Sequence, residues 1–64
     1  MHNDAPNTWR TALTDREREI ASLAAKGLGN QEIAKRLGLA DGTVRFQVHN
    51  ILRKLGLKTR ADLA

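Results

Sequence analysis

The sequence contains no cysteine, and this absence excludes two common ways of holding a small domain together. None of its 64 residues can form a disulfide or supply a thiolate to a structural zinc ion. Only two histidines are present, His2 and His49, and neither has a second ligand in a metal-site pattern. We therefore expect no metal and no cofactor. Helix packing has to stabilise a chain that buries only about 60% of its unfolded surface.

Long apolar runs are also missing. No segment approaches the roughly 18 apolar residues that a membrane span requires. The N-terminal stretch MHNDAPNTWR lacks the apolar part of a signal peptide. Both absences predict a soluble, cytoplasmic protein that does not act at a membrane.

Residue patterns typical of catalysis do not occur. The sequence shows no carboxylate pair, no nucleophile beside a base and no glycine-rich phosphate loop. A domain of this size also has little room to enclose a pocket. We therefore expect no enzymatic activity and no catalytic residues.

Positive charge prevails and is unevenly distributed. The chain carries 11 basic and 7 acidic residues, which gives a net charge of +4. Between residues 42 and 61 no acidic residue occurs, but five basic ones do: Arg45, Arg53, Lys54, Lys58 and Arg60. Such a one-sided segment favours a polyanionic partner, most simply nucleic acid. A solvated surface without a partner has the same composition, so charge alone leaves both interpretations open.

The first predicted helix spans residues 15–26. Thr14 and Glu17 have the spacing of a capping box at its start, and Gly27 follows it as a stop signal. Apolar residues recur within it every three to four positions, which indicates one buried face. A second, shorter helix is expected over residues 30–37, ended by the next glycine.

The third predicted helix is the longest and spans residues 42–55. Its buried stripe consists of aliphatic residues at helical spacing: Val44, Val48, Ile51, Leu52 and Leu55. Phe46 lies nearly opposite this stripe, among polar and basic residues. An aromatic side chain on that face indicates contact with another molecule, whereas shielding by long neighbouring side chains is the simpler alternative. A membrane-binding helix ranks low, because Phe46 is the only bulky apolar residue on the polar face.

The two ends of the chain carry weaker signals. Residues 1–12 show no helical period and contain the only proline, so we predict a flexible tail or linker there. Trp9 either folds back onto the core or stays exposed as a contact for another domain. Thr59 and Asp62 have capping-box spacing, which predicts a short or truncated fourth helix beginning at Arg60. The expected fold is all-α, a small helical bundle with a central helix-turn-helix.

Four segments carry a resemblance to a known family. They are LTDRE at 13–17, GNQEIA at 29–34, TVR at 43–45 and ILRKLGLKTRADL at 51–63. In this order and at these spacings, residues 13–64 resemble the LuxR/NarL-type (also GerE- or FixJ-type) helix-turn-helix domain of bacterial transcription regulators. The resemblance implies a four-helix domain whose third helix enters the DNA major groove, usually as a dimer on paired half-sites.

The resemblance implies contacts with base edges from three residues: Arg45, Phe46 and His49. A guanidinium can donate two hydrogen bonds to guanine, an aromatic ring can pack on a thymine methyl group, and an imidazole can bond to a base or phosphate. Phosphate contacts are implied at further positions: Asn30, Gln31, Thr43, Gln47, Asn50 and Lys54. Positive charge alone adds more candidates for phosphate neutralisation: Lys35, Arg53, Lys58 and Arg60.

The sequence departs from the family pattern at three positions. Gly29 and Ala40 stand where the family commonly has serine ahead of a helix, and Gln47 stands where it often has histidine. Replacing a serine cap by alanine typically costs about 1 kcal/mol, unless the neighbouring Asp41 takes over. The fold is expected to tolerate these changes.

Sequence-specific binding to double-stranded DNA, as the output domain of a bacterial transcription regulator, is the function we expect. In a longer protein an upstream domain would gate it. Region 4 of a sigma factor also resembles the chain, in EIA and GTVR, which would make it a promoter-binding module docked on RNA polymerase. A third alternative is a protein-interaction module that inserts Phe46 into a partner's pocket.

Overall fold

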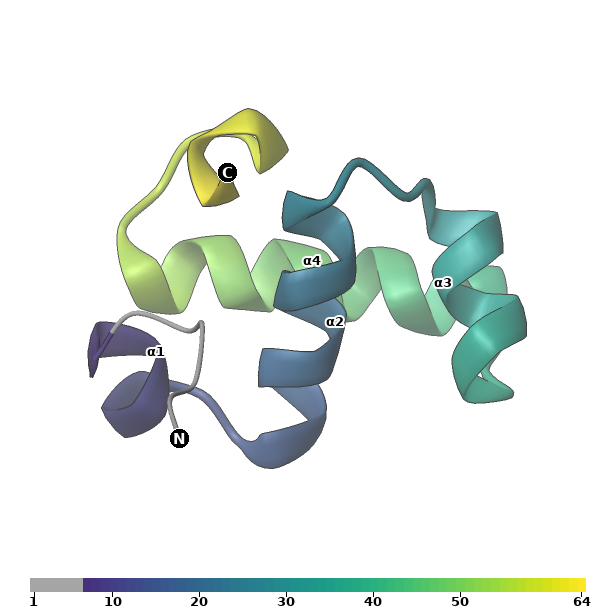
Figure 1. Ribbon diagram of the computed structural model, residues 1–64, viewed down its shortest axis with the longest axis horizontal. Helices are drawn as coiled ribbons and strands as arrows, with labels where there is room; N and C mark the ends of the chain where they lie inside the picture. The colour runs from purple at the N-terminus through teal and green to yellow at the C-terminus, as the bar shows by residue number, and fades with distance from the viewer. Residues whose placement is uncertain (1–6) are drawn as a thin grey trace.

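The computed structural model describes residues 7–64, which fold into helices joined by short turns (Figure 1). The elements are α1 (Asn7–Ala12), α2 (Asp15–Ala25), α3 (Asn30–Leu37), α4 (Asp41–Leu55) and the 3₁₀ helix η1 (Arg60–Leu63). The described residues contain no strand. The predicted all-α class is therefore confirmed. None of the helices described is long and apolar enough to cross a membrane.

α4 is the centre of the fold. In Figure 1, α2 crosses α4 near its middle, α3 lies beside the N-terminal end of α4, and α1 lies beside its C-terminal end. The 3₁₀ helix η1 packs against α2. Every element supplies at least one side chain to a single core: Trp9, Leu13, Ile20, Ala21, Ala24, Ile33, Ala34, Val44, Val48, Ile51 and Leu63.

The start of α2 forms the predicted capping box. The Thr14 side-chain oxygen accepts a hydrogen bond from the Glu17 backbone N–H at 3.1 Å, and a Glu17 carboxylate oxygen accepts one from the Thr14 N–H at 2.9 Å. Two of the N–H groups that a helix leaves without intrahelical partners are thereby satisfied. α2 ends at Ala25, one residue before the predicted end, and Gly27 follows with a positive φ of 96°.

The predicted helix-turn-helix is formed by α3, a short turn and α4. Gly38 ends α3 in the left-handed conformation at φ 69°, and the Leu39 N–H donates back to the Ala34 carbonyl. α4 begins at Asp41, one residue earlier than predicted. Ala40 occupies the cap position and provides no side-chain hydrogen bond. α3 and α4 pack directly against each other, so the turn fixes their relative orientation.

The prediction of a tail over residues 1–12 is wrong for residues 7–12, which form α1. Trp9 folds back onto the core, as one of the two expectations had it, and its side chain is buried. Six residues are too few to show a hydrophobic period, so α1 owes its helical state to the docking of one large aromatic side chain. Residues 1–6 of the predicted tail lie outside the described part of the chain. A domain boundary after residue 12 stays a prediction.

The predicted fourth helix is present as a single 3₁₀ turn, η1. A carboxylate oxygen of Asp62 accepts hydrogen bonds from the backbone N–H groups of Lys58 at 3.2 Å and Thr59 at 3.0 Å. These bonds stabilise the charged carboxylate and lower the pKa of Asp62. Leu63 is buried in the core, which anchors η1 to α2.

Candidate nucleic-acid interface

The outward face of α4 carries the three residues predicted to contact base edges. Val44, Val48 and Ile51 point into the core and thereby orient the opposite face to solvent. Phe46 is 63% exposed, and it is the large hydrophobic residue that stands out on the surface of the described residues. Arg45 and His49 are exposed as well. Periodicity therefore placed all three side chains correctly on the surface.

The hydrogen-bonding groups of this face are available to an external partner. Within residues 7–64, the side chains of Arg45, His49 and Arg53 make no hydrogen bond or ion pair. Most of the remaining phosphate candidates also reach solvent, either exposed or half-buried: Gln31, Lys35, Thr43, Gln47, Asn50 and Lys58. The solvent-facing side of α4 thus combines unpaired donors, two cations and one bare aromatic ring.

Lys54 differs from these residues because it has an internal partner. Its ammonium group donates to both carboxylate oxygens of Glu17, at 2.8 and 2.9 Å. The Glu17 side chain is only 9% exposed, so the pair is partly shielded from water and ties the last turn of α4 to the first turn of α2. The sequence did not predict this pair: its local patterns indicate a cap at Glu17 and a phosphate contact at Lys54. Separation by 37 positions leaves no local signal.

The charge state of Glu17 follows from its surroundings. Burial by itself would raise the pKa of Glu17, but hydrogen bonds from Lys54 and Thr14, together with the Lys54 charge, outweigh it and lower the pKa. Glu17 is therefore ionised at neutral pH. It acts at once as a cap for α2 and as the counter-charge of Lys54.

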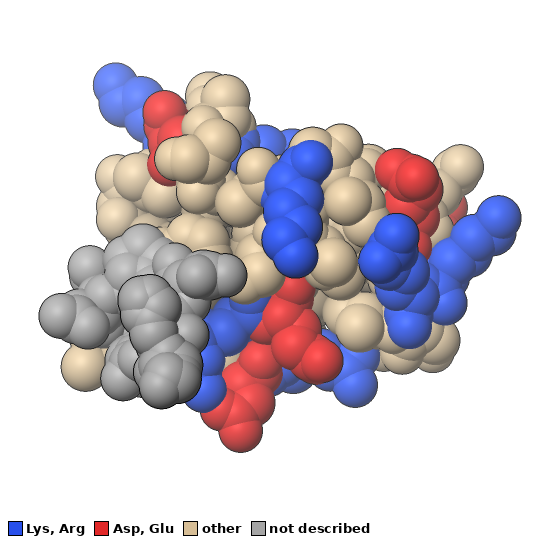
Figure 2. All heavy atoms as spheres, viewed as in Figure 1, with Lys and Arg blue, Asp and Glu red and all other residues tan. Residues whose placement is uncertain are grey.

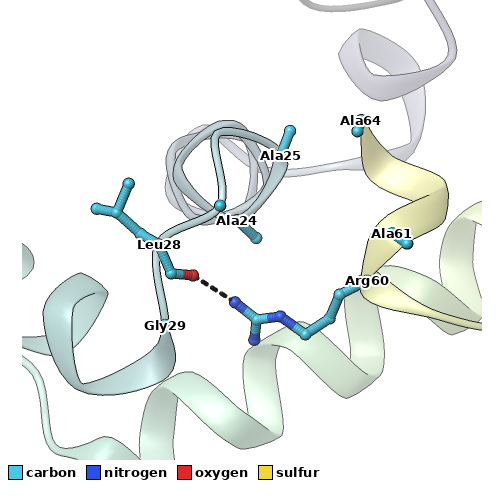
Figure 3. A pocket seen from close by; sticks show the side chains of 8 residues that line it. Ala24, Ala25, Leu28, Gly29, Arg60, Ala61 and Ala64 are labelled. Atoms are coloured by element: carbon cyan, nitrogen blue, oxygen red, sulfur yellow. Dashed lines mark hydrogen bonds between the residues drawn. The ribbon is translucent and has the colours of Figure 1, made fainter.

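Arg60 is also bound internally. One guanidinium nitrogen donates to the Asn30 side-chain oxygen at 2.5 Å, and another donates to the Leu28 carbonyl at 2.6 Å. Figure 3 shows the Arg60 side chain reaching from η1 to Leu28 in the loop before α3. Two residues predicted independently as phosphate contacts, Asn30 and Arg60, are thus brought into contact with each other.

A shallow hollow of about 340 Å³ lies beside the Arg60 side chain (Figure 3). Small residues form most of its wall: Ala24 and Ala25 of α2, Gly27 and Gly29 of the loop that follows, Ala61 of η1, and Ala64. Arg60 is the one residue of the predicted interface that lines it. The hollow therefore lies apart from the exposed face of α4.

Charge on the α2 side of the molecule is mixed. Figure 2 shows acidic and basic side chains close together on that face. Two ion pairs of α2 lie at the surface, Arg16 with Glu19 and Arg18 with Asp15. In contrast, Asp41 at the very start of α4 is the one acidic residue of that helix. The contrast favours α4, rather than α2, as the face for a polyanion.

Comparison with known protein families matches residues 11–64 to the family described as bacterial regulatory proteins, luxR family. The chain is 46% identical over 52 residues to the nitrate/nitrite response regulator protein NarL of Escherichia coli, a match that covers 81% of the chain and 24% of the relative. It is 46% identical over 50 residues to the transcriptional regulatory protein DesR of Bacillus subtilis, covering 78% of the chain and 25% of that protein.

A third relative is the DNA-binding transcriptional activator DevR/DosR of Mycobacterium tuberculosis. It is 43% identical over 54 residues, which cover 84% of the chain and 25% of the relative. The chain therefore spans about a quarter of the length of the relatives it matches. All of the helix-turn-helix, including the exposed face of α4, lies inside the matched family region.

Proposed function

Because the chain belongs to the luxR family of bacterial regulatory proteins, we propose that it binds double-stranded DNA sequence-specifically as the output domain of a transcription regulator. One relative is by its name a DNA-binding transcriptional activator, and another is a response regulator. The observation that carries the proposal is the outward face of α4, where Phe46 is 63% exposed beside donors that have no partner in the described part of the chain. The luxR match favours this function over the sigma-factor alternative.

In this proposal α4 lies in the major groove and three of its side chains contact base edges. Arg45 donates two hydrogen bonds to guanine, Phe46 packs against a thymine methyl group, and His49 bonds to a base one turn further along. Each good contact of this kind is worth roughly 1–3 kcal/mol of discrimination between bases. The ring of Phe46 is bare because its apolar partner is on the DNA.

Phosphate contacts surround this centre and contribute affinity without sequence information. Their donors come from α4, from the α3 segment and from the loop before η1: Asn30, Gln31, Lys35, Thr43, Gln47, Asn50, Arg53 and Lys58. In a helix-turn-helix the first helix crosses the DNA backbone, which is the place proposed for α3. Lys54 and Arg60 are held by internal partners, so their contribution to phosphate binding is proposed to be indirect.

The proposal extends to the setting in which the domain acts. Two copies bind paired half-sites, an upstream domain gates them, and the regulator contacts RNA polymerase in the cytoplasm. The chain catalyses no reaction in this role. The names of two relatives, a response regulator protein and a transcriptional regulatory protein, support the regulatory role in this setting.

The test is selection of bound duplexes from a random pool at moderate salt, followed by sequencing. The expected result is enrichment of a short sequence whose preference changes in Phe46→Ala. Paired half-sites about one helical turn apart would indicate a dimer, and a single half-site a monomer. Absence of any enriched sequence would contradict sequence-specific binding. The protein-interaction alternative would be favoured if the chain bound another protein, if salt did not weaken this binding, and if Phe46→Ala abolished it.

A further inference from the structure

The guanidinium group of Arg60 is fully directed at the loop that leads into α3. Its two terminal nitrogens donate to the Leu28 carbonyl at 2.6 Å and to the Asn30 side-chain oxygen at 2.5 Å. These acceptors flank Gly29, the residue at the cap position of α3. Arg60 itself is held in place because Leu63, three residues on, is buried in the core. One side chain thus links η1 to the first residue of α3.

This contact determines how the Asn30 amide is oriented. A guanidinium carries only donors, so only the carbonyl oxygen of the amide can face it. The amide nitrogen of Asn30, with its two N–H groups, must then point away from Arg60. Asn30 is half-buried, so this nitrogen can reach a partner outside the molecule. Arg60 therefore fixes which end of the amide is presented.

We propose that Arg60 is a positioning residue for DNA binding: it holds Asn30 so that the amide N–H groups donate to a phosphate, and it does not contact phosphate itself. The inference rests on the proposed function, in which α3 lies along the DNA backbone. The loop carbonyl of Leu28 gives the guanidinium its second anchor, which a lysine at position 60 cannot engage at the same time in the same planar geometry.

Salt dependence separates positioning from direct contact. When a cationic side chain that contacts one phosphate is removed, the slope of log affinity against log salt concentration becomes less steep by about 0.9. Loss of a contact from the neutral Asn30 amide releases no counterion and leaves the slope unchanged. We expect Arg60→Gln to weaken binding of the selected duplex by about tenfold, with the wild-type slope. A slope that is less steep by about 0.9 would overturn the proposal.

A double-mutant cycle provides the second readout. Asn30→Ala should weaken binding about as much as Arg60→Gln, and the double variant should bind no more weakly than either single one. Multiplying losses in the double variant would show independent contacts and overturn the proposal. All affinities are measured by fluorescence anisotropy at a temperature where circular dichroism shows every variant to be folded. If Arg60 only stabilised the fold, the affinities would not change under these conditions.

Arg60→Lys keeps the positive charge and guards against a variant that does not fold. It loses the two-pronged geometry, so we expect weaker binding with an unchanged slope, and wild-type affinity would overturn the proposal. Arg53→Gln is the matched comparison, since Arg53 has no partner within residues 7–64 and its removal should reduce the magnitude of the slope. If the wild-type chain binds no duplex, the proposed function fails. If the wild-type chain and Arg60→Gln bind equally, only the positioning role fails.

Discussion

The two ends of α4 differ in how they use polar side chains. Near its N-terminus, Arg45 and His49 flank the exposed Phe46, and neither makes a hydrogen bond or ion pair within the described residues. In its last turn, Lys54 is bound by the nearly buried carboxylate of Glu17. The N-terminal end is thus available to a partner, whereas Lys54 at the C-terminal end helps to hold the fold together. Basic residues that look equivalent in the sequence therefore have different roles.

The largest expected effect on stability comes from breaking the Glu17–Lys54 pair at the C-terminal end of α4. Glu17→Ala removes the partner of Lys54 and one half of the capping box, and we expect it to lower the free energy of unfolding by about 2–3 kcal/mol. For a domain of this size, each kcal/mol shifts the Tm by roughly 4–8 °C. Thermal unfolding followed by circular dichroism measures the change.

Glu19→Ala is the matched control on the same helix. Glu19 pairs with Arg16 at 3.3 Å, but both side chains are about half exposed, so the loss should stay below about 1 kcal/mol. Similar falls in Tm for the two variants would show that burial gives the Glu17–Lys54 pair no special weight.

At the N-terminal end of α4, a substitution should change DNA affinity and leave stability nearly unchanged. Phe46→Ala removes a side chain that is 63% exposed, so the Tm should change little. Affinity for the selected duplex should fall by about 1–2 kcal/mol, because the packing on a thymine methyl group is lost. Fluorescence anisotropy with selected and scrambled duplexes measures both values. A large fall in Tm, or an equal loss on both duplexes, would assign Phe46 to the fold or to non-specific binding instead.

Acid should remove the contribution that the Glu17–Lys54 pair makes to stability. Since the pKa of Glu17 is lowered by folding, its contribution to stability is complete above the pKa of the unfolded chain, about 4.3, and is lost as pH falls through the lower folded value. The stability difference between wild type and Glu17→Gln should therefore be constant near neutral pH and shrink below about pH 4. Asp62 is affected in the same direction in both proteins and cancels in the difference. A difference that grows toward acid would contradict a lowered pKa.

The smallest expected effect concerns the start of α4. Ala40 has the extended backbone of a cap residue, φ −78° and ψ 151°, but contributes no side-chain hydrogen bond. Ala40→Ser supplies a hydroxyl acceptor for the first turn, and we expect a gain of about 0.5–1 kcal/mol in thermal unfolding. Ala40→Gly is the control and should gain less. Unchanged stability in Ala40→Ser would indicate that Asp41 already fulfils the role of the cap.

The sequence predicted the parts of the fold that depend on neighbours in the chain. The capping box at Thr14 and the glycine ends of α3 and α4 are local, so helix bounds came within one residue. α1 was missed because it has too few residues for a hydrophobic period. In the candidate interface, periodicity predicted that Phe46 is exposed. It did not predict that Lys54 and Arg60 have partners 37 and 30 positions away, because such pairs leave no local pattern.

The proposed function requires that the outward face of α4 is the surface that contacts DNA. The most direct measurement is to follow the backbone amide signals of ¹⁵N-labelled protein by NMR while the selected duplex is added. We predict the largest changes at Arg45, Phe46 and His49, smaller ones at the start of α3, and little change at α1. Changes centred on α1 or on the hollow beside η1, with α4 unaffected, would contradict it.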